Sequence, residues 1–185
     1  MRIIAGKHRG LNLNTFDIDN IRPTIDRVRE NIFNKIQIGV VDSCVLDLFG
    51  GTGAVSLEFL SRGAREVITV DNNRKSIELI KKNFNKAKEA LHLLEKDFKD
   101  ALNVLKGKKF DFIFLDPPYA ENYGEEAIKL ICEYKLLAED GLIVYEHLEG
   151  KQFSIPSNLE LIDSKKYGTV YVSYIRWCRW LGLLI

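Results

Sequence analysis

Apolar and polar residues alternate in blocks along this chain, and from residue 44 onward the blocks predict strands and helices in turn. Short, nearly continuous apolar runs are typical of buried parallel strands, and apolar residues three or four positions apart are typical of helices. The strands are predicted at 44–49, 65–71, 91–94, 110–115, 141–146, 159–162 and 169–177, and the helices at 54–60, 75–88, 98–105 and 125–134. This alternation indicates an α/β fold, a doubly wound and mostly parallel sheet with helices on both faces.

The two ends of the chain depart from that pattern. The last predicted strand, 169–177, alternates apolar with polar residues, which is typical of an antiparallel strand. The first 22 residues predict an arm with a small β-hairpin, because short apolar stretches flank a glycine-containing turn. A helix then follows, from an N-cap at Thr24 to Ile36. We therefore expect one domain, composed of an N-terminal arm and helix over 1–40 and the sheet over 41–185.

A glycine-rich turn follows the first predicted strand and opens a helix: Asp47-Leu48-Phe49-Gly50-Gly51-Thr52-Gly53. Glycine lets a backbone turn tightly and approach a ligand, and a helix N-terminus favours anionic groups. The string is not the dinucleotide-binding one, because Ser56 stands at the third glycine position and Asp47 would repel a pyrophosphate. An acid there suits a cationic group, such as the sulfonium or ammonium group of S-adenosylmethionine.

Four acids stand at or just beyond four successive predicted strand ends: Asp47, Asp71, Asp97 and Asp116. In open α/β sheets these ends line one crevice. Asp71 stands where an acid meets ribose hydroxyls in Rossmann-type sites, and Asp97 could accept from an adenine amino group with Phe98 against the ring. Asp71 and Asp97 would each, taken alone, fit a helix cap equally well, so the coincidence of all four acids carries the prediction.

The strand at 110–115 ends in Asp116-Pro117-Pro118-Tyr119. A residue before proline stays extended, and two prolines make a stiff corner that cannot donate backbone hydrogen bonds. The carboxylate and the free carbonyls can accept hydrogen bonds and the ring can stack, which suits a nucleobase with an exocyclic amino group. A strand exit followed by a turn, with Asp116 as a cap, is the structural alternative.

The charge balance limits any nucleic-acid surface to a local one. The chain has 185 residues, 46% of them hydrophobic, and a net charge of +1, which describes an ordinary globular domain. The first 35 residues carry seven basic against four acidic side chains. The candidate RNA contacts among them are Arg2, Lys7, Arg9, Arg22, Arg27 and Arg29. A solvated helix face with a basic tip would have the same composition.

Other site classes lack support in the sequence. The three cysteines and three histidines show no metal-ligand spacing, which predicts reduced thiols and no metal. No signal peptide or membrane-length apolar stretch is visible. We therefore expect a monomeric cytoplasmic protein without a membrane partner. The apolar tail at 176–185 predicts either a packed edge or a weak self-association patch.

The chain resembles the class I S-adenosylmethionine-dependent methyltransferases, and more narrowly the RsmD family of bacterial 16S rRNA guanine-N2 methyltransferases. The resemblance covers nearly the whole chain. The glycine turn together with Asp-Pro-Pro-Tyr is typical of amino methyltransferases, and the Arg-Pro-Thr to Arg-Val-Arg-Glu segment at 22–30 narrows it to this family. The chain departs from the family at Asp71, where glutamate is usual, and in the tail, which runs past the expected end.

The resemblance implies a Rossmann-like fold, S-adenosylmethionine as cofactor and 16S rRNA or the small ribosomal subunit as partner. The cofactor would be held by Asp47, Phe49, Gly51, Gly53, Asp71, Asn72, Asp97 and Phe98. The target guanine would be held by Asp116, Pro117, Pro118 and Tyr119, and the basic N-terminal part would engage the RNA.

The residues leave four alternatives open. An amino methyltransferase could instead act on adenine-N6 in DNA or RNA, or on a protein glutamine, although Asp116 stands where the glutamine enzymes have asparagine. A dinucleotide oxidoreductase is disfavoured by Asp47 and Ser56. An RNA-binding module without activity stays open because a fold alone does not establish function. The four strand-end acids disfavour it.

Overall fold

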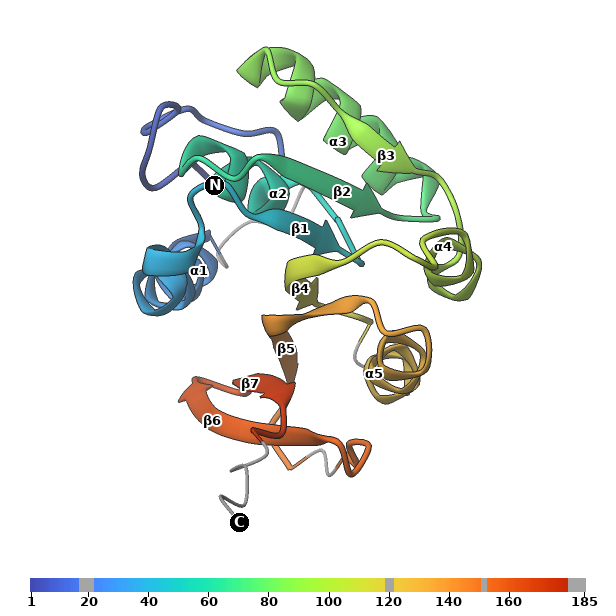
Figure 1. Ribbon diagram of the computed structural model, residues 1–185. Helices are drawn as coiled ribbons and strands as arrows, with labels where there is room; N and C mark the ends of the chain where they lie inside the picture. Colours follow the sequence, from blue (N-terminus) through green and yellow to red (C-terminus); the bar gives the residue numbers. More distant parts are fainter. Residues whose placement is uncertain (17–21, 119–121, 151–152, 180–185) are drawn as a thin grey trace.

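The computed structural model describes residues 1–16, 22–118, 122–150 and 153–179. Within them the chain forms a seven-stranded sheet in the order β3-β2-β1-β4-β5-β7-β6 (Figure 1). The strands are β1 (Cys44–Asp47), β2 (Glu66–Val70), β3 (His92–Leu94), β4 (Phe110–Leu115), β5 (Leu137–Leu148), β6 (Leu159–Tyr167) and β7 (Val170–Trp177). Neighbours among β1 to β5 are parallel, and β7 is antiparallel to β5 and β6. The predicted mostly parallel sheet with an antiparallel last strand is confirmed.

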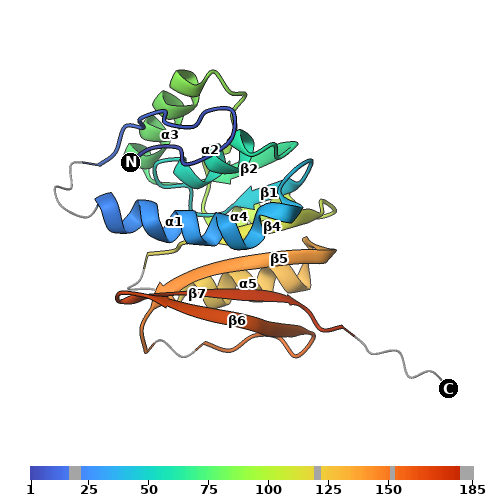
Figure 2. The same cartoon turned by 90° about the vertical axis from the view of Figure 1, so that its left-hand side faces the viewer.

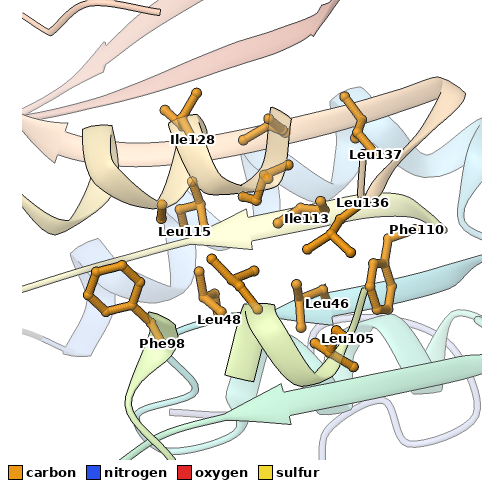
Figure 3. Close-up of a cluster of buried hydrophobic side chains, with 14 of the residues drawn as sticks. Leu46, Leu48, Phe98, Leu105, Phe110, Ile113, Leu115, Ile128, Leu136 and Leu137 are labelled. Atoms are coloured by element: carbon orange, nitrogen blue, oxygen red, sulfur yellow. The ribbon is translucent and has the colours of Figure 1, made fainter. Parts of the chain in front are cut away.

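Helices cover both faces of this sheet, as predicted. They are α1 (Arg22–Ile36), the short 3-10 helix η1 (Gln37–Gly39), α2 (Ala54–Ser61), α3 (Arg74–Ala87), α4 (Phe98–Val104) and α5 (Tyr123–Glu133). Figure 1 shows α1 on one side of the sheet and α4 and α5 on the other. Neighbouring residues of one strand serve opposite faces. Phe114 is buried in a cluster with Phe33 of α1, whereas Leu115 is buried with Phe98 of α4 (Figure 3).

Some predicted boundaries were wrong. Helix α1 begins at Arg22, two residues before the expected cap at Thr24, because the fixed φ of a proline suits the first helical turn. Strand β6 continues five residues beyond the predicted end at 162, through Tyr167. Its added residues 163–166 are polar because β6 is an edge strand, where charged side chains protect the open edge.

The N-terminal arm forms less β-structure than predicted, a single antiparallel bridge between Arg2 and Asn12. The arm is nevertheless packed on the domain, because Ile3 and Leu13 are buried in a cluster with side chains of α2 and α3 (Figure 2). Gly6 shows how close the arm lies to α2. Its φ is +81°, and a Cβ there would stand 1.8 Å from the carbonyl oxygen of Ser61.

The carboxylate of Glu58, a fully buried residue of α2, ties the arm to the domain. Its two oxygens accept the backbone N–H groups of Ile4 at 2.8 Å and Ala5 at 3.1 Å. They also pair with Arg62 at 2.8 Å and with the buried Arg29 at 3.8 Å. A buried carboxylate is tolerated only with such partners, so arm, α1 and α2 depend on one another.

We expect Glu58→Ala to cost about 3–5 kcal/mol of unfolding free energy, because two N–H groups of the arm lose their acceptor and the buried guanidinium of Arg29 loses one of its two carboxylate partners. Urea denaturation measures this. The matched control is Glu78→Ala, which removes a carboxylate of an exposed i,i+4 pair with Arg74 on α3 and should change little. Equal losses for the two variants would contradict the structural role of Glu58.

Candidate functional site

The four predicted acids do stand at the carboxyl ends of the strands. Asp47 is the last residue of β1, Asp71 follows β2, Asp116 follows β4, and Asp97 stands three positions after β3. Because β3, β2, β1 and β4 are neighbouring parallel strands, these ends share one edge of the sheet.

A small hollow of about 50 Å³ opens at this edge. The residues that line it are Leu48, Phe49, Asp71, Asn72, Lys96, Asp97, Phe98, Pro118 and Tyr123. We call it the strand-end hollow. It brings together five of the predicted cofactor residues with Pro118, one of the residues predicted to hold the target base (Asp116, Pro117, Pro118 and Tyr119), which we call the base clamp. Asp47, Gly51, Gly53, Asp116 and Pro117 are not among its lining residues.

Aromatic rings form one wall of the strand-end hollow. The ring of Phe98 lies with its centroid 5.6 Å from that of Phe49 and 5.2 Å from that of Tyr123. Tyr123 is the first residue of α5 and was not predicted, because the strand-end argument does not reach the start of the following helix. Its signal in the sequence is its position, eight residues after the end of β4.

The acids that line the strand-end hollow are held in place by backbone groups. Asp71 accepts the N–H of Gly51 at 2.8 Å through one oxygen and that of Asn73 at 2.8 Å through the other. Gly51 has φ +55°, which glycine adopts easily. Asp97 caps α4 by accepting the N–H of Lys99 at 2.9 Å. The cap proposed as the alternative role of Asp97 is therefore present, and it leaves the second carboxylate oxygen for a ligand.

Asp47 lies beneath the glycine turn, not on the surface of the hollow. Its residue is 1% exposed, and it accepts the N–H of Ser56 at 3.1 Å and the hydroxyl of Ser56 at 2.5 Å. Burial raises the pKa of Asp47 to about 6. The Ser56 hydrogen bonds act in the opposite direction, and the charge of Asp71 adds a smaller increase. Ser56, which the sequence offered only as evidence against a dinucleotide, is thus the partner of this carboxylate.

The clamp residues directly follow β4. Asp116 and Pro118 are exposed and Pro117 is buried, whereas Tyr119 lies outside the described residues. The pKa of Asp116 is raised, because protein atoms crowd its carboxyl and because the carboxylates of Glu146 and Asp47 lie nearby. Water still reaches Asp116, and its screening limits that rise.

The basic residues of the arm and α1 divide into two groups. Arg2, Lys7, Arg9 and Arg27 are exposed, and Lys7 pairs with Glu89 at 2.6 Å. Arg29 is only 4% exposed and pairs with Asp26 at 3.0 Å as well as with Glu58. The guanidinium of Arg29 is therefore engaged in the interior, and we leave Arg29 out of the RNA contacts proposed below. The side chain of Arg22 lies outside the described residues.

Two features are absent from the described ranges. Across 1–16, 22–118, 122–150 and 153–179, no three histidine, cysteine or acidic side chains are grouped so that they could hold a metal ion. In the same ranges no helix is long and apolar enough to span a membrane.

Comparison with known sequences places the chain among ribosomal RNA methyltransferases. The family model described as conserved hypothetical protein 95 matches residues 1–176. Ribosomal RNA small subunit methyltransferase D of Haemophilus influenzae is 36% identical over 174 residues, which cover 92% of this chain and 90% of that protein. The protein of the same name from Escherichia coli K12 is 34% identical over 171 residues, which cover 92% of this chain and 86% of that protein. A putative rRNA methyltransferase of Bacillus subtilis, YlbH, is 36% identical over 180 residues, covering 94% and 97%.

Comparison with solved structures confirms the fold. The putative methyltransferase yhhF from Escherichia coli superposes with a TM-score of 0.84 at 32% identity, over 96% of this chain and 97% of that one. A putative methyltransferase complexed with SAH, at 19% identity, shares the fold with a TM-score of 0.63, over 80% of this chain and 48% of that one. The predicted Rossmann-like methyltransferase fold is therefore confirmed.

The pKa of Asp47 predicts how stability depends on pH. A carboxyl whose pKa is raised by folding binds its proton more tightly in the folded state. The contribution of Asp47 to the free energy of unfolding is therefore fully present below its ordinary pKa of 3.8 and is lost as the pH rises through about 6. Relative to wild type, Asp47→Asn should gain up to roughly 3 kcal/mol of unfolding free energy between pH 4 and pH 7.

Urea unfolding at several pH values measures that difference. Asp42→Asn, at an exposed carboxyl, is the control and should follow wild type across the range. A difference between Asp47→Asn and wild type that does not change with pH would contradict the raised pKa.

Proposed function

Because the chain belongs to the RsmD family of ribosomal RNA small subunit methyltransferases, we propose that it transfers a methyl group from S-adenosylmethionine to the N2 amino group of a guanine in 16S rRNA. One observation carries the proposal. Pro118 lines the same hollow as Asp71, Asp97 and Phe98, so one residue of the proposed base clamp lies beside the side chains proposed to bind the nucleoside.

The lining of the strand-end hollow fits the adenosine part of the cofactor. The braced carboxylate of Asp71 can accept ribose hydroxyls, and Asp97 can accept the adenine amino group. Phe98 and Phe49 offer an apolar wall to the base. A hollow of about 50 Å³ is far smaller than a typical ligand site, so lining side chains such as Lys96 and Tyr123 must move apart on binding.

Asp47 has a longer-range role in this proposal. When ionised it supplies negative charge beneath the glycine turn, next to the place where a sulfonium or ammonium group would lie. Burial raises the pKa of Asp47 and so disfavours this charge, and a cation nearby would compensate it. The sulfonium of the bound cofactor supplies the transferable methyl group.

The clamp positions the nucleophile. The lone pair of an exocyclic nitrogen is delocalised into the ring, so the nitrogen is a weak nucleophile until it is oriented. The carboxylate of Asp116 and the carbonyl of Pro117 would accept its two hydrogens and direct the lone pair toward the methyl carbon. Positioning of this kind supplies about 7–11 kcal/mol in ideal cases. When the nitrogen accepts the methyl group and the cofactor leaves as the neutral thioether, Asp116 or water would take the proton that the amino group loses.

The substrate base must leave its stack before it can reach this clamp. Tyr119, which lies outside the described residues, would stack on it and contribute about 1–3 kcal/mol. Arg2, Lys7, Arg9 and Arg27 would contact RNA phosphates. With rRNA as substrate, we propose that the protein works as a cytoplasmic monomer and needs no metal.

The direct test uses wild-type protein and tritiated S-adenosylmethionine. Naked 16S rRNA, small ribosomal subunits, DNA and protein extract are offered in parallel, and methylated nucleosides are separated after digestion. N2-methylguanosine from 16S rRNA or from small subunits is the expected product. Label only in N6-methyladenosine or in protein would contradict the proposed substrate.

The role of the clamp predicts the behaviour of Asp116→Ala. Transfer to RNA should fall by at least about 10²-fold, because the amino group loses the acceptor that orients it. Cofactor binding, measured by calorimetry, should stay within about twofold, since Asp116 does not line the strand-end hollow. Near wild-type transfer by this variant would remove Asp116 from the mechanism.

The exposed basic group predicts the salt dependence of RNA binding. The double variant Arg9→Gln with Arg27→Gln should bind more weakly, and its slope of log K against log salt should shrink by about 0.7–0.9 for each phosphate that the protein no longer neutralises. Lys108→Gln is the control, since Lys108 lies just before the amino end of β4, away from the site. An unchanged slope in the double variant would exclude these two arginines from the RNA interface.

A further inference from the structure

Glu146 stands beside the clamp on the neighbouring strand. β4 and β5 are parallel, and the register pairs Phe114 with Val144 and Leu115 with Tyr145. The next pair along the same register is Asp116 and Glu146. Neighbouring strands are about 4.8 Å apart, so the two acids leave the sheet edge side by side.

The two carboxylates also face the same side of the sheet. Phe114 and Val144 are buried together in the cluster that includes side chains of α1, whereas Leu115 and Tyr145 are buried in the opposite cluster. Side chains alternate along an extended strand, and a residue before proline stays extended. Asp116 therefore follows Phe114 and Glu146 follows Val144 onto the α1 side.

Electrostatics agrees with this placement. Crowding of the Asp116 carboxyl by protein atoms is the main cause that raises its pKa, and the charge of Glu146 is the second. Two like charges so placed repel each other, and donors on a bound ligand would relieve that repulsion. Glu146 is half-buried, so its carboxylate is partly shielded from water.

We propose that Glu146 is a specificity-determining residue that accepts the N1–H of the target guanine while Asp116 accepts from its N2 amino group. This inference rests on the function proposed above. Guanine presents N1–H and N2–H₂ donors next to each other on its Watson–Crick edge. Adenine and 2-aminopurine carry an acceptor at N1, which would face the Glu146 carboxylate unpaired. Sites built on a buried hydrogen bond reject analogues that lack it.

The experiment compares guanine with 2-aminopurine, which keeps the 2-amino group and replaces N1–H by an acceptor. The 16S rRNA is assembled by ligation with either base at the position that wild type methylates, and is supplied naked and in small subunits. We expect wild type to prefer guanine by about 10²- to 10⁴-fold in kcat/KM. Glu146→Gln should reduce that ratio at least tenfold, because its amide can donate to the acceptor at N1.

Two controls separate specificity from folding. Glu139→Gln changes the same residue type in β5 at its exposed amino end and should leave the ratio at the wild-type value. Glu146→Asp keeps a carboxylate and should lose rate while it retains the preference for guanine. Cofactor binding by calorimetry should be equal in all variants, since Glu146 does not line the strand-end hollow.

The outcomes are distinguishable. A ratio for Glu146→Gln within about twofold of wild type, whatever its absolute rate, would overturn the role of Glu146 and leave the proposed function intact. Failure of wild type to methylate guanine in any form of 16S rRNA would overturn the proposed function and this inference with it.

Discussion

The parallel pairing of β4 between β1 and β5 is the constraint on which the site depends. Val45 pairs with Phe112 on one side of β4, and Phe114 pairs with Val144 on the other. This register brings the carboxyl ends of three strands to one edge and sets which face each terminal side chain meets. A slip of one residue would turn Asp116 toward α4 and α5, away from the face that Glu146 shares.

The buried carboxylate of Glu58 is a second constraint on the structure, because it determines which basic residues of the N-terminal part remain available to bind RNA. It engages Arg29 and the backbone of the arm, so part of the N-terminal positive charge stabilises the fold. The exposed Arg9 and Arg27 are thereby carried on a frame fixed to α2 and α3. Charge counting along the sequence cannot separate these two groups, since a buried and an exposed arginine contribute equally to it.

The sequence predicted best where burial makes a continuous signal. β4 has its predicted bounds because it is apolar and central. The prediction for β6 ended too early, because residues 163–166 of this edge strand need no apolar partner and are polar. The strand-end positions of the acids followed from topology alone. The position of Asp47 beneath its turn did not, because it depends on the hydrogen bonds to Ser56, which form only once α2 is placed. Tyr123 was missed for the same reason, since only the packing of α5 against α4 brings it to Phe98.

The anchors of the site and the side chains around them differ in how much they can move. Pro117 is buried and two successive prolines have fixed φ angles, so the clamp cannot swing to admit a ligand. Asp71 is held by two backbone N–H groups and is equally fixed. The space that an adenosine needs must therefore come from lining side chains outside these anchors, chiefly Lys96 and Tyr123. With both anchors rigid, moving these side chains leaves unchanged the geometry between Asp116 and the nucleoside-binding wall, which in-line methyl transfer requires.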